Sequence, residues 1–211
     1  MMYAQVENDV VVRVGLRPDW RTDDGSPVSD ERLAQDGWLP IEREEPQYDP
    51  LRQTAAEDPM AGWEVHEDRV VVTWTVSDMA LSERKAALRD AVNAKLNAVL
   101  TGGYTVEAGA MAGKVLQTRN LEDRTNWLIS QASYSAAVAA DQGAVEGAKF
   151  RTADNATYTL TFADGLAVLL AMAAWGAACM DHSWALKDAI VAAGDGAALD
   201  LIDIEAGWPG A

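Results

Sequence analysis

Residues 161–193 read TFADGLAVLLAMAAWGAACMDHSWALKDAIVAA, and this stretch decides the fold of the second half of the chain. Thr161 with Asp164 three residues later resembles a capping box, and Gly194 follows where a helix commonly ends. We therefore expect one long helix that reaches about Ala193. Its most apolar part, residues 165–180, is shorter than the ~20 residues that a membrane-spanning helix needs. The sequence predicts a buried helix and no membrane insertion.

A helix with almost no polar face must be covered on every side. Helices expected over residues 78–100 and 120–141 can cover two of these sides. We expect another copy of the chain to cover the third, and a trimer is favoured because it places a symmetric helical centre there. A monomeric core of three helices is the alternative.

The composition excludes several classes of partner. The chain has 211 residues, of which 49% are hydrophobic and 24% charged, which is typical of a globular protein. It has 17 Lys and Arg residues against 33 Asp and Glu residues, so its net charge is −16. Such an acidic surface repels phosphates, so we expect no nucleic-acid partner. No secretory leader is recognisable at the N-terminus, and we expect synthesis in the cytoplasm.

Elements shorter than the apolar helix are predicted around it. Apolar residues at the helical period from Leu81 to Val99, after Ser77 as an N-cap, predict the helix over 78–100, which Gly102-Gly103 ends. The other expected elements are strands over 104–106 and 114–116, a helix over 120–140 with Asn120 as N-cap, a hairpin over 149–151 and 157–160, and a short helix or strand over 200–205.

The N-terminal part reads as β-structure. Two β-prone runs, 3–6 and 10–14, flank a turn at Asn8-Asp9 and predict a hairpin. Residues 63–76 predict a second hairpin with its turn near Glu67-Asp68. Residues 18–53 lack periodicity and predict a long irregular connection. The expected fold class is α+β: a small β-hairpin region over 1–76, a connecting helix over 77–103, and a mainly helical domain with a small hairpin over 104–211.

Patterns that carry chemistry are weak, so we expect no catalytic residue, no cofactor and no metal site. Residues 181–183 (DHS) have the residue types of a hydrolase triad. Neighbours on a helix point about 100° apart, however, so a polar patch is the better interpretation. The acidic residues around His66 lie at a predicted turn, where charges are simply solvated. Cys179 in an apolar stretch predicts a buried, inert thiol.

The eight tryptophans are the least ordinary feature of the composition. Several lie beside turns and prolines, where a small domain has little core to offer, and exposed aromatic residues are enriched in protein–protein interfaces. Packing under a loop is the alternative. The candidate partner contacts are Trp20, Trp38, Trp63 and Trp208.

A resemblance enters at FRTADN (150–155), YTLT (158–161) and WALKDAI (184–190). Over about residues 80–195 these segments resemble a family of domains of unknown function encoded among bacteriophage tail genes. GWLP (37–40) and EDRVVVTW (67–74) make the N-terminal part similar to phage tail-fibre-associated proteins. The family supplies no catalytic residues to carry over.

The resemblance implies a structural component of the virion tail, in a tail fibre, tail tip or baseplate, that attaches to other tail proteins. The alternative is an assembly chaperone for a tail fibre, absent from the mature virion. An enzyme such as a glycan hydrolase is disfavoured, because no pattern fixes two carboxylates at a defined separation.

Overall fold

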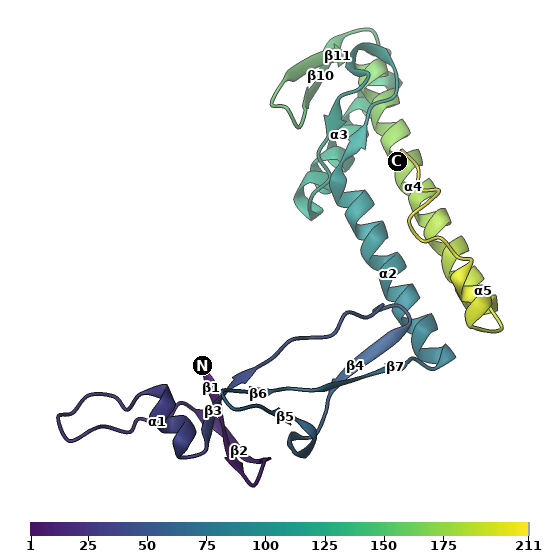
Figure 1. The fold of residues 1–211 in the computed structure, drawn as a ribbon. Coiled ribbons are helices and arrows are strands. Elements are labelled where there is room, and N and C mark those ends of the chain that lie inside the picture. Colours follow the sequence, from purple (N-terminus) through teal and green to yellow (C-terminus); the bar gives the residue numbers. More distant parts are fainter. Residues whose placement is uncertain (211) are drawn as a thin grey trace. The chain divides into compact units, whose positions relative to one another are not determined.

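The computed structural model describes residues 1–210 and divides into two compact units, residues 1–80 and the part that begins at Leu81 (Figure 1). The fold is α+β: a curled mixed sheet of five strands, a half-barrel with hairpins, precedes a helical part with long helices. The elements of the first unit are β1 (Met2–Glu7), β2 (Val10–Leu16), α1 (Asp30–Gln35), β3 (Trp38–Glu42), β4 (Gln53–Glu57), the 3-10 helix η1 (Met60–Gly62), β5 (Glu64–Val65), β6 (Val70–Val71) and β7 (Trp74–Asp78).

The sheet of the first unit has the strand order β2-β1-β3-β6-β5. All neighbours are antiparallel except β3 and β6, which are parallel. The predicted first hairpin, β1–β2, is confirmed. Asn8 and Asp9 have φ angles of 51° and 61°, the positive values that a tight turn between twisted strands requires.

The segment expected to be irregular is partly ordered, because α1 and β3 lie within it and β4 begins at its last residue, Gln53. β3 occupies the centre of the sheet, where Trp38 and Leu39 are buried. Burial of these two large side chains holds the strand in place, and five residues are too few for periodicity to reveal it. The first unit has two buried apolar clusters. The larger one comprises Ala4, Val11, Leu39, Trp63, Val70 and Val72. The smaller one comprises Tyr3, Val28, Leu33 and Trp38.

The second predicted hairpin is only partly correct. β5 and β6 pair through two residues each, but the chain then leaves the sheet, and β7 pairs with β4 instead. Ser77 lies within β7, where its hydroxyl is 3.2 Å from that of Thr54. It is therefore not the N-cap predicted for the next helix, which begins at Leu81.

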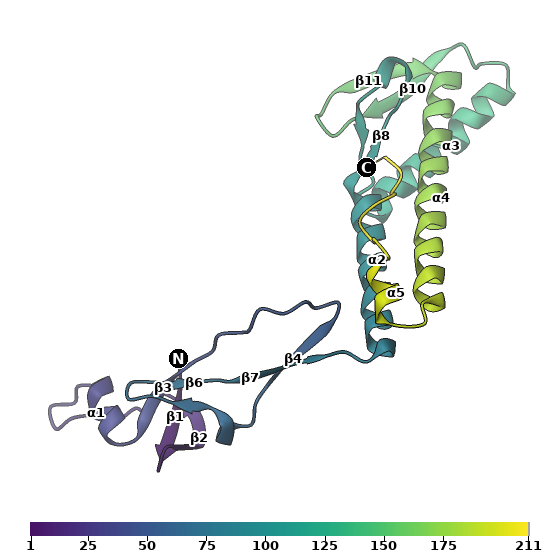
Figure 2. The same ribbon diagram turned by 45° about the vertical axis from the view of Figure 1, so that its right-hand side comes forward.

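The second unit is built around α4, which packs against α2, α3 and β10 (Figure 2). The expected caps are confirmed: the Asn120 side chain accepts from the Asp123 amide, and the Thr161 hydroxyl accepts from the Asp164 amide. The elements of this unit are α2 (Leu81–Gly102), β8 (Tyr104–Thr105), the 3-10 helix η2 (Gly109–Met111), β9 (Val115–Leu116), α3 (Leu121–Ala139), β10 (Glu146–Arg151), β11 (Thr157–Thr161), α4 (Phe162–Ala192) and α5 (Gly196–Asp200).

Gly165 permits the closest approach in this core. A Cβ on this residue would lie 2.3 Å from the Cβ of Ala148 in β10. Because Ala148 is fully buried, α4 can cross the β10–β11 hairpin at this separation only with a glycine here. The main cluster of this unit comprises Tyr104, Val106, Met111, Leu116, Tyr134, Ala148, Phe150 and Leu169.

The segment after α5 runs back along α4 (Figures 1 and 2). The Trp175 indole donates to the Pro209 carbonyl at 3.0 Å, and the Trp208 indole donates to the Ile204 carbonyl at 2.9 Å. His182 lies edge-on to Trp208, with ring centroids 4.8 Å apart. The short element predicted over 200–205 lies earlier than expected, as α5.

Candidate partner-binding surface

About half of the circumference of α4 is exposed. Only five of its residues are buried: Gly165, Leu169, Cys179, Ser183 and Ile190. α2 and α3 cover two sides, as the sequence suggested, and the segments over residues 104–111 and 204–210 lie along a further side. The remaining side, which carries Leu170, Ala177 and Trp184, is exposed within residues 1–210. The alternative of a monomeric core that buries α4 on every side does not hold for the described residues, and cover by another copy of the chain stays a prediction.

A regular row of side chains follows this open side, and we call it the outer seam. Its members recur at alternating steps of three and four residues: Leu170, Ala173, Ala177, Met180, Trp184, Lys187 and Val191. Leu170, Trp184 and Val191 are 50%, 54% and 61% exposed. This spacing, sustained over three heptads, is the pattern of a helix that packs against other helices.

Charge interrupts the outer seam only near its C-terminal end. Lys187 is a member of the seam, and Asp181 and Asp188 lie next to it on the exposed surface. No hydrogen bond or ion pair involves the Lys187 ammonium within residues 1–210. A single charged residue in an apolar seam is the device that sets register and copy number in coiled coils.

α4 is also the one helix in the described part of the chain whose length and composition would allow it to cross a membrane. Its most apolar 18-residue window has a mean hydropathy of 1.7, and 17% of that window is buried. Core helices of globular proteins meet the same criteria. The three charged side chains at positions 181, 187 and 188 are costly in hydrocarbon.

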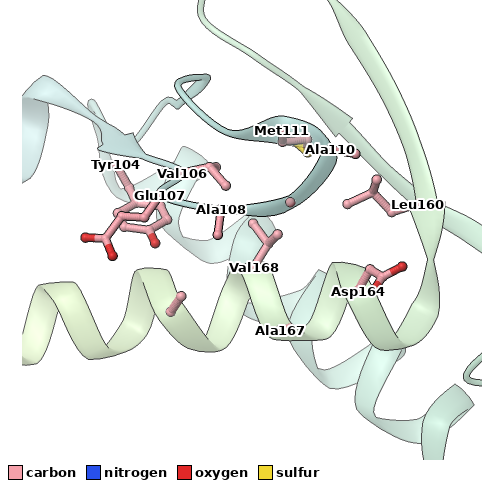
Figure 3. Close-up of a pocket in the computed structure, with 12 residues that line it drawn as sticks. Tyr104, Val106, Glu107, Ala108, Ala110, Met111, Leu160, Asp164, Ala167 and Val168 are labelled. Carbon is pink, nitrogen blue, oxygen red and sulfur yellow. The ribbon is translucent and has the colours of Figure 1, made fainter.

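A groove lies on another side of α4, between the helix and the segment that carries β8 and η2 (Figure 3). The main cavity has a volume of about 410 Å³. A second hollow of about 220 Å³ shares Tyr104 and Glu107 with it and extends toward Trp175. The main cavity is lined chiefly by apolar side chains: Val106, Met111, Leu160, Ala167, Val168 and Ala171.

The groove has an acidic group at each end (Figure 3). Glu107 lies beside Tyr104 at one end, and Asp164 lies at the other, in the first turn of α4. Burial raises the pKa of the Tyr104 hydroxyl, and the negative charge of Glu107 raises it further. The Asp164 carboxylate accepts a hydrogen bond from the Thr161 hydroxyl at 2.8 Å.

Of the four tryptophans predicted to contact partners, one is exposed. Trp20 is 43% exposed and lies edge-on to Trp38, whereas Trp38, Trp63 and Trp208 are 9%, 6% and 3% exposed. The Trp63 indole donates to the Asp58 carbonyl at 2.9 Å, and the Arg43 guanidinium lies over its ring. The buried three pack within their own units, so the premise that they lack a core does not hold. Trp184 is exposed but was not among the predicted partner contacts, although its seven-residue spacing to Ala177 and Val191 is a signal that the sequence contains.

The edge strand β2 adds an exposed apolar surface in the first unit. Val10, Val12 and Leu16 are all exposed there. β2 has a single hydrogen-bonded neighbour in the sheet order, and η1 packs against it. Edge strands of this kind are where a partner chain can add a strand.

The residues with reactive side chains do not assemble into a triad. Asp181 is exposed, whereas Ser183 is fully buried and its hydroxyl has no hydrogen-bond partner. His182 instead contacts the Ala206 carbonyl at 3.0 Å. Burial raises the pKa of the Cys179 thiol, which disfavours the nucleophilic thiolate. Within residues 1–210, no group of three or more His, Cys, Asp or Glu side chains is placed to hold a metal ion.

The FRTADN segment forms the turn between β10 and β11. Asp154 accepts from Lys114 Nζ at 2.8 Å and from the Thr152 hydroxyl at 2.5 Å. The Lys114 ammonium, aided by the Thr152 hydroxyl, holds the pKa of the Asp154 carboxyl well below its ordinary value. Asn155 has a φ of 61°, which this tight turn requires. The segment therefore ties the hairpin to the strand pair β8–β9.

Comparison with known families gives one match. Residues 83–206 match the family described as "Domain of unknown function (DUF4376)", which covers more than half of the chain and includes α4 with its outer seam and groove. The expectation of a domain of unknown function over about residues 80–195 is confirmed to that extent, whereas the description names neither a phage nor a tail role. No curated protein and no solved structure matches the chain.

Proposed function

The chain belongs to the family of DUF4376 domains, and we propose that it is a structural component of a bacteriophage tail that attaches other tail proteins to one another. The outer seam of α4 is the observation that carries this proposal. A seam that is largely apolar, regular and mostly exposed within its own chain is suited to protein–protein association. The resemblance at residues 150–161 and 184–190 supports placement among tail proteins, in a fibre, tail tip or baseplate, and hence in the virion.

Copies of this chain are the first proposed occupants of the outer seam, with a trimer favoured. Small side chains at Ala173 and Ala177 let helices approach closely, and Trp184 supplies a large anchor. The acidic residues Asp181 and Asp188 flank Lys187, so each copy offers both charges for pairing with its neighbours. The edge strand β2 is left to bind a different tail protein by strand addition.

The mass of the protein in solution tests this self-association. Light scattering after size-exclusion chromatography is expected to give three times the chain mass for the wild type. Ala177→Glu places a charge in the middle of the seam and is expected to give the monomer mass. Ala94→Glu, at an exposed position on α2, is the matched control and should remain trimeric. A wild type that is monomeric at all concentrations would show that the seam does not bind its own copies.

A protein inventory of purified virus particles tests the role in the tail. We expect mass spectrometry to find the chain in a small multiple of three or six copies per particle. Absence of the chain from particles that infect normally would overturn the proposal of a virion component, whatever its oligomeric state.

An assembly chaperone for a tail fibre is the second candidate. An exposed apolar seam on a chain of net charge −16 is suited to transient masking of a partner, because the charge keeps the complex soluble. Co-expression separates the two functions. A chaperone increases the yield of soluble fibre protein and is absent from mature particles, whereas a tail component is retained.

A further inference from the structure

We propose that the groove beside α4 binds an extended segment of a partner protein in which a large apolar side chain lies between two basic residues. This inference rests on the proposed function, because it specifies the chemistry of a segment that the chain would hold. The groove and the outer seam occupy different sides of α4, so the two surfaces can be tested separately.

The size and lining of the cavity favour an apolar side chain. Its volume of about 410 Å³ falls in the range of pockets that enclose small ligands. Val106 and Met111 form one wall of the cavity (Figure 3). Ala167, Val168 and Ala171 of α4 form the other wall. An aromatic or branched side chain that enters this space leaves water without having to pair any polar group.

The polar groups of the groove favour cations and disfavour anions. No hydrogen bond or ion pair engages the Glu107 carboxylate within residues 1–210, and no lysine or arginine lines either hollow. Asp164 receives one hydrogen bond from Thr161 and keeps acceptor capacity. The Tyr104 side chain is 97% buried, and its hydroxyl, which has no partner in the described part of the chain, lies between the two hollows.

The spacing of the two acidic ends fits an extended chain. Asp164 and Ala171 are seven residues apart on α4, or about 10 Å, and Trp175 lies about 16 Å from Asp164 along the helix axis. Glu107 lines both hollows, of which one reaches Ala171 and the other Trp175, so it lies beside the part of α4 between these two residues. In an extended segment, residues i and i+4 are about 13 Å apart and lie on the same side as residue i+2. The groove therefore fits a basic residue, an apolar residue and a second basic residue at alternate positions.

A synthetic pentapeptide tests this specificity on the full chain. The probe is the acetylated and amidated sequence Lys-Thr-Phe-Thr-Lys, followed by calorimetry and by amide chemical shifts in two-dimensional NMR. We expect saturable binding that weakens with added salt, with shifts concentrated at residues 107–111 and 164–171. Replacing both lysines by glutamates, or the phenylalanine by glycine, is expected to abolish binding. Equal binding of the glutamate peptide would overturn the proposal.

Two variants locate the site. Glu107→Gln removes one carboxylate and should lower the affinity for the peptide about two- to fivefold, which is the size expected for the loss of a partly exposed ion pair. Glu122→Gln removes the same charge from the first turn of α3, outside the groove, and should leave binding unchanged. Ala167→Phe fills the cavity and should abolish binding, whereas Ala94→Phe on α2 should not. Unchanged binding by Ala167→Phe would show that the peptide binds elsewhere. A chain that is present in virions but does not bind the probe would refute the groove proposal alone.

Discussion

Replacing Gly165 by alanine sets two effects of opposite sign against each other. Alanine is the better helix former, and Gly165 lies inside the 31-residue helix α4. An added Cβ would lie 2.3 Å from the Ala148 Cβ and 3.3 Å from a ring carbon of Phe150. Helix propensity alone predicts a more stable protein, and packing predicts a less stable one.

The distances decide the sign. The gain in helix propensity is about 1 kcal/mol. Carbon atoms are in favourable contact at about 3.5–4.0 Å, so the Ala148 contact requires a displacement of more than 1 Å. Neither methyl group can rotate away, because each Cβ is fixed to its backbone, and α4 or β10 must move. Overpacking of this kind costs typically 1–3 kcal/mol and occasionally more. We expect Gly165→Ala to lower the free energy of unfolding of the second unit by about 1 kcal/mol.

Gly176 in the same helix is the matched control. Nothing lies within 4 Å of the Cβ that an alanine would add there. Gly176→Ala therefore keeps the gain in helix propensity without the clash, and it should stabilise the unit by up to about 1 kcal/mol. The two variants carry the same chemical change in the same helix, and their opposite signs separate packing from propensity.

Urea unfolding followed by circular dichroism at the helical wavelength measures both variants. Since the chain has two units, the helical transition must be fitted by itself. Ala148→Gly supplies the partner for a double-mutant cycle: Gly165→Ala should cost less in that background, by more than the ~0.5 kcal/mol typical of independent sites. A Gly165→Ala protein as stable as Gly176→Ala, or a cycle without coupling, would refute the argument.

Three further predictions concern the ion pair at the FRTADN turn, the buried thiol and the C-terminal segment. Asp154→Asn should lower the melting temperature more at about pH 7 than at about pH 3. Lys114 keeps the pKa of the Asp154 carboxyl below its ordinary value of about 4, so its stabilisation is progressively lost as the pH falls below about 4. Equal losses of melting temperature at the two pH values, measured in thermal scans, would contradict this. Cys179 should not react with a thiol reagent in the native protein and should react fully in denaturant, since it is buried. Rapid labelling of the native protein, followed by absorbance, would show that the packing around this part of α4 opens readily. Trp208→Ala should make the segment after α5 susceptible to limited proteolysis, because a buried tryptophan contributes on the order of 3 kcal/mol of packing. An unchanged cleavage pattern in mass spectrometry would show that Trp175 and His182 hold the segment in the absence of the Trp208 ring.

Local signals predicted much of the second unit. The caps at Asn120 and Thr161, the turn at Asn155 and the end of the helix before Gly103 each depend on a few neighbouring residues, and all four lie where expected. The predicted helix start at Ser77 was wrong because Ser77 pairs with Thr54 in the antiparallel strands β4 and β7, and Thr54 lies more than twenty residues earlier in the chain. Such pairing is decided by distant parts of the chain, and a local window does not contain it.

The candidate surface was predictable only in part. The sequence indicated that α4 needs cover on a third side, but the expectation of burial concealed the row that contains Trp184. Prolines and turns beside Trp38 suggested exposure, whereas the first unit buries this ring together with Tyr3 and Leu33. The groove was missed because residues 107–111 carry no motif. Their apolar and acidic side chains become a site only when Val106 and Met111 face α4.

The packing of α2 against α4 has a consequence for the order of events during synthesis. All strands of the first unit lie within the first 80 residues, so that unit can fold while the second is still being made. α2 emerges next, and Leu88 and Val92 on its apolar face are buried in the finished unit. Fifty-nine residues lie between the end of α2 and the start of α4, which corresponds to a delay of roughly 3–12 seconds at typical translation rates of about 5–20 residues per second. During that interval the nascent chain displays an uncovered helix face, which a ribosome-associated factor can bind before α4 arrives to cover it.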